Sequence, residues 1–164
     1  VLRQGIMGGM GGNRFQPDGA LTRGQIVTIL YRMANSPSVS GKFPFTDVKE
    51  GRYYTEAVAW AYENGVVHGM SETEFAPLAS VNREQAATMV VQYLESQGIT
   101  SDAEEVDFAD SGDISGYAVE TIAKAQDLGI LYGYEDNTIR PKNTLSRAEG
   151  VALLMNLVEC LEAA

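Results

Sequence analysis

The 164-residue sequence has one cysteine and one histidine, and each scarcity excludes a class of site. Cys160 has no partner within the chain, so a disulfide framework is excluded, and we expect its thiol to pack in the core. With His68 as the one imidazole, a multi-histidine metal centre is excluded, and we expect this histidine, in a glycine-rich loop, to be solvated rather than part of a Ser-His-Asp or Cys-His site. No apolar run approaches the roughly 18 to 20 residues of a transmembrane helix. We therefore predict no membrane insertion, no cofactor and no metal centre.

Basic residues are outnumbered, because 12 Lys and Arg stand against 22 Asp and Glu, with a net charge of −10. This balance disfavours nucleic acids and anionic membranes as partners, since both require a basic surface. Any anionic ligand has to be bound by a local cluster of positive charge. The most acidic stretch, residues 102–113, lacks the order of acids and glycine that an EF-hand requires, and we interpret it as a solvated loop rather than a calcium site.

One phrase occurs three times along the chain. Segments 5–25, 65–85 and 129–149 each begin with Gly-Ile or Gly-Val, continue through a second glycine and a Phe-x-Pro or Ile-x-Pro turn, and end in a Thr/Asn/Ser-Arg-x-Gln/Glu tetrapeptide. The period is about 60 residues, and whole units shift together, which is typical of a repeat architecture. We predict three repeats, at residues 1–36, 43–97 and 106–162.

A second phrase opens the later repeats. Phe45-Thr46-Asp47-Val48 precedes a run from Tyr53 to Ala61, and Phe108-Ala109-Asp110 precedes a run from Tyr117 to Ala125. The chain begins at a position that aligns with the end of such a run. We therefore expect the first repeat to lack its first helix.

Hydrophobic periodicity predicts an all-α fold. Residues 22–34, 82–96 and 146–161 carry apolar side chains at helical spacing, and each of these helices follows a repeated glycine-rich loop. Residues 53–63 and 117–128 predict two shorter helices, which end at Gly65 and Gly129, where left-handed caps are expected. Each repeat is thus predicted as helix, loop, helix.

The repeated tetrapeptide predicts a capping box at the start of each longer helix. Its first residue accepts a hydrogen bond from the third helical N–H, and the Gln or Glu three positions on reaches back to the cap. Capping does not explain the arginine, because a cation in the first helical position opposes the helix dipole. Either it pairs with an internal carboxylate, most plausibly Asp47 or Asp110, or it binds an external anion together with free N–H groups of the first turn. Both interpretations stay open, and they can coexist.

These phrases, in this order, resemble the S-layer homology (SLH) domain, which usually occurs as three tandem copies. The resemblance covers nearly the whole chain. It implies three helical prongs about a pseudo-threefold axis, with ligand grooves between repeats. It also implies a bacterial cell-surface anchor that binds secondary cell-wall polysaccharide non-covalently, often through a pyruvate ketal on an amino sugar.

The resemblance implies binding roles for three sets of residues. They are the tetrapeptide arginines, the second loop glycines and the acids of the opening phrase, namely Arg23, Arg83, Arg147, Gly9, Gly69, Gly133, Asp47 and Asp110. Glycine would let the backbone approach a sugar ring closely. Tyr53, Tyr117 and Trp60 are candidates for apolar faces against sugar rings, with core packing as the alternative explanation.

We predict that the chain is not an enzyme. Two carboxylates could serve glycoside hydrolysis, but Glu84 and Glu149 lie in first turns, where structural roles explain them. The predicted function is a secreted, extracellular module that anchors a protein to the bacterial cell wall through an acidic amino sugar. The alternative is a protein-interaction or self-assembly module, which forms a homo-oligomer through the incomplete first repeat.

Overall fold

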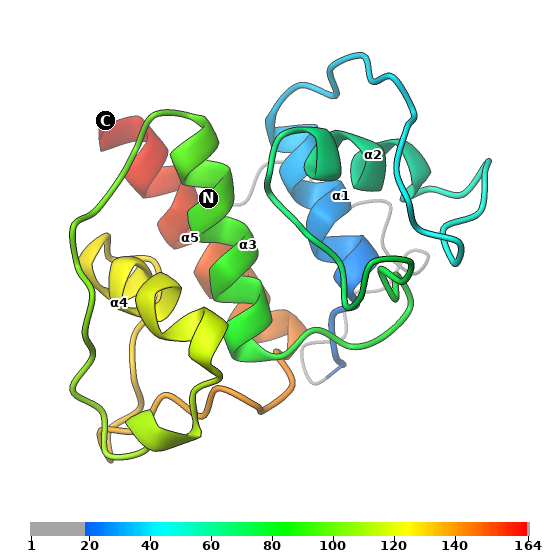
Figure 1. Ribbon diagram of the computed structural model, residues 1–164. Coiled ribbons are helices and arrows are strands. Elements are labelled where there is room, and N and C mark those ends of the chain that lie inside the picture. Colours follow the sequence, from blue (N-terminus) through cyan, green and yellow to red (C-terminus); the bar gives the residue numbers. More distant parts are fainter. Residues whose placement is uncertain (1–18, 164) are drawn as a thin grey trace.

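The computed structural model describes residues 19–163, and the fold within that range is helical (Figure 1). The α-helices are α1 (Arg23–Met33), α2 (Thr55–Glu63), α3 (Arg83–Ser96), α4 (Val119–Asp127) and α5 (Arg147–Ala163). Short 3-10 helices occur at η1 (Ser111–Asp113) and η2 (Gly116–Ala118). The described residues form isolated β-bridges but no strand, so the all-α prediction is confirmed.

The helix ends follow the predicted local chemistry. Thr22 and Asn82 complete capping boxes with the glutamines three positions later, and Ser146 exchanges two hydrogen bonds with Glu149, at 3.0 Å each. Gly65 and Gly129 follow α2 and α4 in the left-handed region, at φ 72° and 76°, as a glycine cap requires. The predicted boundary at residue 117 differs, because the chain there forms the η2 turn before α4 begins.

The three repeats meet in a closed ring of backbone hydrogen bonds. The residue before each N-cap takes part: Leu21 donates to Leu145 (3.1 Å), Leu145 donates to Val81 (2.9 Å), and Val81 donates to Leu21 (2.9 Å). All three side chains are fully buried. This cyclic pattern relates the repeats by the pseudo-threefold axis that the resemblance implied.

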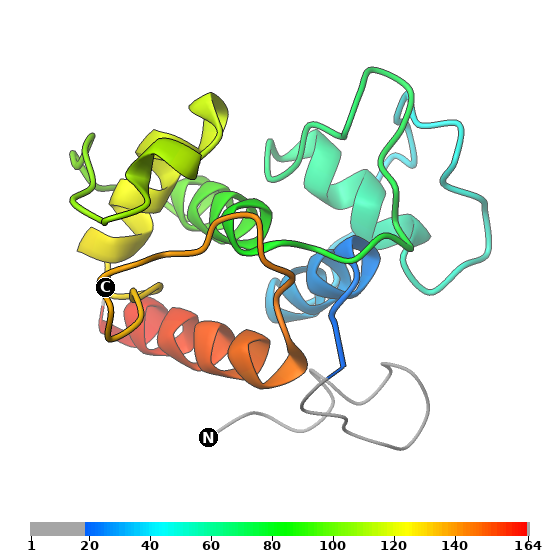
Figure 2. The same ribbon diagram turned by 90° about the horizontal axis from the view of Figure 1, so that it is seen from below.

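Helices pair across repeats rather than within them. Helix α1 packs on α2 and α3 packs on α4, so the second helix of one repeat lies against the first helix of the next. Figure 1 shows the two pairs as separate arms, and Figure 2 shows α5 alongside them on the remaining side. None of the helices in the described range has both the length and the apolar character that a membrane crossing requires.

Aromatic side chains fill the junction of the arms. Trp60 is 4% exposed and packs against Tyr31 and Tyr93, at ring-centroid distances of 5.6 and 5.9 Å. Its core packing leaves no face for a sugar ring, so the binding role considered for Trp60 is corrected here. Cys160 is half-buried at the edge of the core, where burial raises the pKa of its thiol.

Candidate functional site

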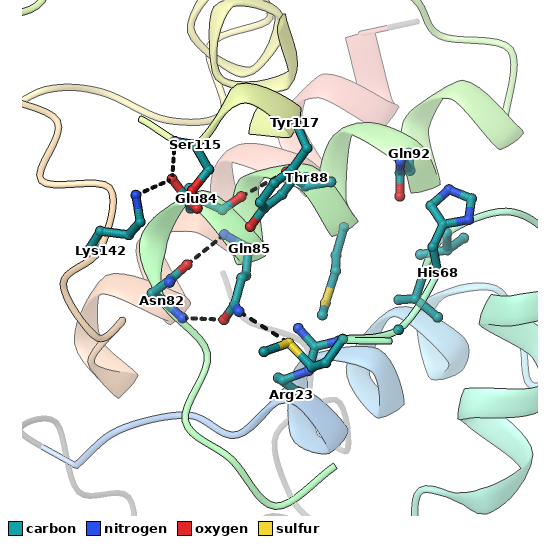
Figure 3. A pocket seen from close by; sticks show the side chains of 15 residues that line it. Arg23, His68, Asn82, Glu84, Gln85, Thr88, Gln92, Ser115, Tyr117 and Lys142 are labelled. Atoms are coloured by element: carbon teal, nitrogen blue, oxygen red, sulfur yellow. Dashed lines mark hydrogen bonds and ion pairs between the residues drawn. The ribbon is translucent and has the colours of Figure 1, made fainter. Parts of the chain in front are cut away.

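A groove of about 570 Å³ lies between the second and third repeats (Figure 3). Its walls are the loop 66–70 on one side and the start of the third repeat on the other, with the first turns of α3 between them. Arg23, from the first repeat, reaches the groove from α1. The lining residues are Arg23, Val66, Val67, His68, Gly69, Met70, Asn82, Glu84, Gln85, Thr88, Met89, Gln92, Ser115, Tyr117 and Lys142. All three repeats thus contribute to one site.

The Arg23 side chain is fixed by a hydrogen bond from its Nε and by the contact of its guanidinium with an aromatic ring. Its Nε donates to the carbonyl of Phe75 at 2.7 Å, and its guanidinium lies 4.7 Å from the centre of the Phe75 ring. Among the residues that the structure describes, the terminal nitrogens have no hydrogen-bond acceptor. Burial lowers the pKa of Arg23, against the opposing effects of Tyr117 and Asp47. Arg23 is 4% exposed, so it is a desolvated cation whose terminal nitrogens have no acceptor among the described residues.

Arg83 occupies the equivalent position on α3, but its terminal nitrogens are already bound. Its Nε donates to the Ile139 carbonyl (2.8 Å), while the two terminal nitrogens donate to Glu149 (3.1 Å) and to the Tyr132 carbonyl (3.2 Å). The Tyr134 ring covers the guanidinium at 4.6 Å. Arg83 is therefore neutralised within the fold, and it joins the second repeat to the third.

Arg147 begins α5 and is half-buried. Its backbone N–H donates to the carbonyl of Gly19 at 2.7 Å, in the same way that Arg23 donates to Ala79 and Arg83 to Asn143. Gly9, for which the resemblance implies a binding role, lies outside the described residues.

The acids of the opening phrase bind backbone and not arginine. Asp47 accepts from the N–H groups of Phe75 and Ala76, at 2.9 and 2.7 Å. Asp110 accepts from Ile139 and Arg140 in the same way, at 2.9 and 2.8 Å. Asp47 therefore accepts a hydrogen bond from the Phe75 N–H, while Arg23 donates one to the Phe75 carbonyl. The predicted pairing of these aspartates with the tetrapeptide arginines is wrong, because both partners bind the turn between them.

The first N–H groups of α1 and α3 are satisfied within the protein. In α1, Arg23 donates to Ala79 at 2.9 Å and Gly24 donates to Pro77 at 2.8 Å, and the third N–H binds the cap. Helix α3 repeats the pattern with Asn143 and Pro141 as acceptors. The expectation that free N–H groups at these two helix starts bind an anion is therefore wrong. An anion in the groove has to be bound by side chains.

The loop glycines are required by packing. Gly69 has φ 92°, and a Cβ there would lie 2.4 Å from the Phe45 ring. A Cβ on Gly133 would lie 2.5 Å from the Phe108 ring. In each later repeat the opening phenylalanine thus packs on the loop glycine. Gly69 also lines the groove, so its packing role does not remove it from the site.

The two tyrosines that open the shorter helices are exposed. Tyr117 is 57% exposed, and Figure 3 shows it on the groove wall above α3. Burial of its hydroxyl and the nearby charge of Glu84 raise the pKa of Tyr117 to about 12, so this phenol is neutral at physiological pH. Tyr53, its counterpart, is exposed and packs edge-on against Tyr54 at 5.1 Å.

The sequence analysis gave no binding role to Glu84, Gln85 and Lys142. Glu84 is buried, accepts a hydrogen bond from the Ser115 N–H at 3.0 Å and lies 3.6 Å from the Lys142 ammonium. These contacts join the first turn of α3 to the third repeat. Gln85 binds Asn82 as the capping box requires, and its amide nitrogen donates to the Met70 sulfur at 3.6 Å. The sequence did contain a signal for the role of Gln85, because the equivalent residue of the third repeat is the acid Glu149.

The described residues hold no cluster of three His, Cys, Asp or Glu side chains that could bind a metal ion. The groove has one desolvated cation, one flat aromatic face and an apolar side formed by Val66, Val67 and Met89. These features suit a small polar ligand that carries a negative charge and has one apolar face.

Comparison with known proteins identifies relatives of the whole chain. The S-layer homology domain model matches residues 1–27, 44–87 and 107–149. An endoglucanase of Bacillus sp. strain KSM-635 is 31% identical over 96% of this chain and 17% of its own length. The surface-layer 125 kDa protein of Lysinibacillus sphaericus is 28% identical over 99% of this chain and 14% of its own. The cellulosome-anchoring protein of Acetivibrio thermocellus is 28% identical over 92% of this chain and 35% of its own length. The chain thus spans a minor part of each of these relatives.

Proposed function

The chain belongs to the S-layer homology domain family, and we propose that it is a non-catalytic module that holds a larger protein on the bacterial cell surface. Relatives named as surface-layer and cellulosome-anchoring proteins support an anchoring role. The endoglucanase carries the matched segment as 17% of its length, which leaves ample chain for a separate catalytic part. The ligand we propose is a secondary cell-wall polysaccharide with an acidic amino sugar, such as one that carries a pyruvate ketal.

The observation that carries this proposal is the state of Arg23 in the groove. Its Nε is fixed on the Phe75 carbonyl, while its terminal nitrogens have no acceptor among the described residues. A pyruvate ketal presents one carboxylate, which a pre-oriented guanidinium can bind through charge-assisted hydrogen bonds. The net charge of −10 does not prevent this, since at about 0.15 M salt charges beyond about 8 Å are largely screened.

The remaining walls suit a sugar ring. Tyr117 offers an exposed aromatic face, and the small accessible parts of Met89 and Val67 line the groove. Sugar rings have C–H faces that pack on such surfaces while their hydroxyls bind the polar rim. A volume of about 570 Å³ lies within the range of small-molecule sites.

The proposed site contains fewer residues than the resemblance implied. Arg83 is bound to Glu149 and to two carbonyl groups, so we assign it a structural role. Asp47 and Asp110 shape the turns and contact no ligand in this proposal. Arg147 and Gly9 stay binding candidates that the resemblance implies, and Tyr53 stays a candidate for an apolar face against a sugar ring.

Retention on purified cell walls tests the proposal. The wild-type chain is expected to sediment with pyruvylated walls and to lose most of its retention when the ketal pyruvate is removed. Arg23→Gln should abolish retention on intact walls. Arg23→Lys should keep part of it, because the compact lysine ammonium keeps the charge but lacks the paired N–H donors of the guanidinium. Arg52→Gln, at an exposed arginine outside the groove, is the matched control. Equal retention of wild type and Arg23→Gln, both folded, would exclude the site.

A further inference from the structure

One side of helix α3 faces the groove. Four of its residues line the groove at the three- and four-residue spacing that places side chains on one side of a helix, namely Gln85, Thr88, Met89 and Gln92. The Gln85 side chain is bound in the capping box, and the Thr88 hydroxyl donates to the Glu84 carbonyl at 2.8 Å. Gln92 is the remaining polar residue on this side of the helix, about one turn beyond Thr88.

The side-chain oxygen of Gln92, Oε1, is buried and has no hydrogen-bond partner within residues 19–163. No other side-chain oxygen in that range is both removed from solvent and unpaired. Folded proteins pair nearly all such atoms, because burial takes away the hydrogen bond to water and something has to replace it. An unpaired acceptor in a residue of the groove wall therefore points to a donor that arrives with a ligand.

The equivalent residue of the third repeat is paired within the fold. Asn156 occupies on α5 the place that Gln92 occupies on α3, counted from the first residue of each helix. Its Nδ2 donates to the carbonyl of Ile130 at 3.1 Å, in the loop that follows α4. The same position thus fixes a loop in one repeat and carries an unpaired oxygen beside a groove in the other.

We infer that Gln92 determines specificity in the groove, and that its Oε1 accepts a hydrogen bond from the acetamido N–H of an N-acetylated amino sugar. The inference rests on the proposed function, in which Arg23 binds the carboxylate of the same sugar. Figure 3 shows Arg23 and Gln92 on separate parts of the groove wall, so two substituents of one ring can be bound at once. The terminal torsion of glutamine is broad, so the amide turns its oxygen towards a ligand at little cost. This N–H is the donor that distinguishes such a sugar from a plain hexose.

Titration calorimetry with two synthetic probes tests this inference on the whole chain. One probe is the methyl glycoside of a pyruvylated N-acetylhexosamine, and the other carries hydrogen in place of the acetamido group. Wild type should bind the first probe about tenfold more tightly or better, since the second leaves the Gln92 oxygen unpaired. Gln92→Met should lose this preference, because methionine has a similar length but lacks the amide oxygen. Gln126→Met, at an exposed glutamine of α4 outside the groove, is the matched control and should keep it.

A second variant, Gln92→Asn, separates ligand recognition from local packing, because asparagine already occupies the equivalent place on α5. It should also bind both probes about equally, since we expect the shorter amide to bind the loop as Asn156 does. The inference is wrong if either Gln92 variant keeps the wild-type preference, or if wild type binds both probes equally. In the latter case the proposed function stands, provided that Arg23→Gln abolishes binding of both probes. Failure of wild type to bind either probe would instead overturn the proposed function, and this inference with it.

Discussion

The Arg83 guanidinium and the Glu149 carboxylate form an ion pair at 3.1 Å that joins the second repeat to the third. Tyr134 adds a hydrogen bond to the same carboxylate oxygen. At the equivalent place one repeat earlier, Arg23 faces Gln85, and Met70 stands in the position of Tyr134. Two substitutions between repeats thus distinguish an arginine neutralised by the fold from one that faces a groove.

Replacing Gln85 by Glu should close the groove to anions. The new carboxylate would lie beside Arg23 as Glu149 lies beside Arg83, and it would compete with a ligand carboxylate for the same donors. We expect retention on pyruvylated walls to fall at least tenfold, about 1.4 kcal/mol in binding free energy. Titration of the purified protein with a pyruvylated amino sugar measures the change directly.

The Gln85→Glu variant should not harm the fold. Glu serves in the capping box of α5 through the same contacts that Gln85 makes with Asn82. An acid in the first turn also favours the helix dipole. Gln85→Leu is the matched control, since it removes the cap contact without adding charge. Unchanged affinity in Gln85→Glu would mean that Arg23 does not bind the anion.

Glu149→Gln should destabilise the protein and change how its stability depends on pH. Burial tends to raise the pKa of Glu149, but hydrogen bonds from Tyr134 and Ser146, together with the charge of Arg83, lower it overall. A carboxylate with a lowered pKa stabilises the fold above its unfolded pKa, and this contribution is lost as pH falls through the folded pKa. The substitution should therefore cost about 1 to 2 kcal/mol at pH 7, because the buried Arg83 loses its anionic partner.

Urea unfolding at several pH values measures this effect. The stability difference between wild type and Glu149→Gln should be constant near neutral pH and should shrink below about pH 4.5, the ordinary value for a glutamate. Glu120→Gln is the control, since this acid is 61% exposed and pairs with Lys124 one turn along the same helix, where such ion pairs contribute little. A difference that persisted unchanged into acid would contradict the role of the Arg83–Glu149 pair.

The periodicity of the sequence was enough to predict the helices, because each long helix starts at a capping box and each short one ends at a glycine. Both are local signals, and the structure confirms them at Thr22, Asn82, Gly65 and Gly129. The ring through Leu21, Val81 and Leu145 could not be read from spacing alone. It depends on hydrogen bonds between segments that lie 60, 64 and 124 residues apart in the sequence, which leave no local pattern.

The site was predicted less completely than the fold. The sequence indicated that Arg23 needed a partner, but the expected partner, Asp47, binds the backbone of Phe75 and Ala76 instead. Residue type does not show whether a carboxylate binds a side chain or the backbone of a turn. The groove itself combines side chains from three repeats, so its position follows from tertiary packing.

Gly69→Ala should destabilise the fold more than Gly65→Ala. Both glycines have positive φ, so alanine is strained at either position by about 1 to 2 kcal/mol. At Gly65 a Cβ meets no atom within 4 Å, whereas at Gly69 it lies 2.4 Å from the Phe45 ring. We expect the second substitution to cost at least about 1 kcal/mol more, because the ring has to shift in a packed core. Equal unfolding midpoints in denaturant would contradict this account of the loop glycine.

Tyr117→Ala should weaken glycan binding without changing stability. The ring is more than half exposed on the groove wall, so its removal leaves the core intact, and exposed substitutions are usually within about 0.5 kcal/mol of wild type. Loss of an aromatic face against a sugar ring should lower affinity about tenfold, within the range for aromatic contacts. Tyr117→Phe should bind almost as wild type does, because the contribution comes from the ring.

The pH dependence of binding tests the same residue separately. Burial and Glu84 raise the pKa of Tyr117 to about 12, so the phenol stays neutral and cannot repel an anion up to about pH 10. Affinity of the wild type and of Tyr117→Phe should therefore remain parallel from pH 6 to pH 10. Leu78→Ala removes an exposed apolar side chain outside the groove, so it is the control for the general loss of exposed apolar surface. If Tyr117→Ala and Leu78→Ala had equally small effects, the sugar would not contact this wall, and the groove would bind through Arg23 alone.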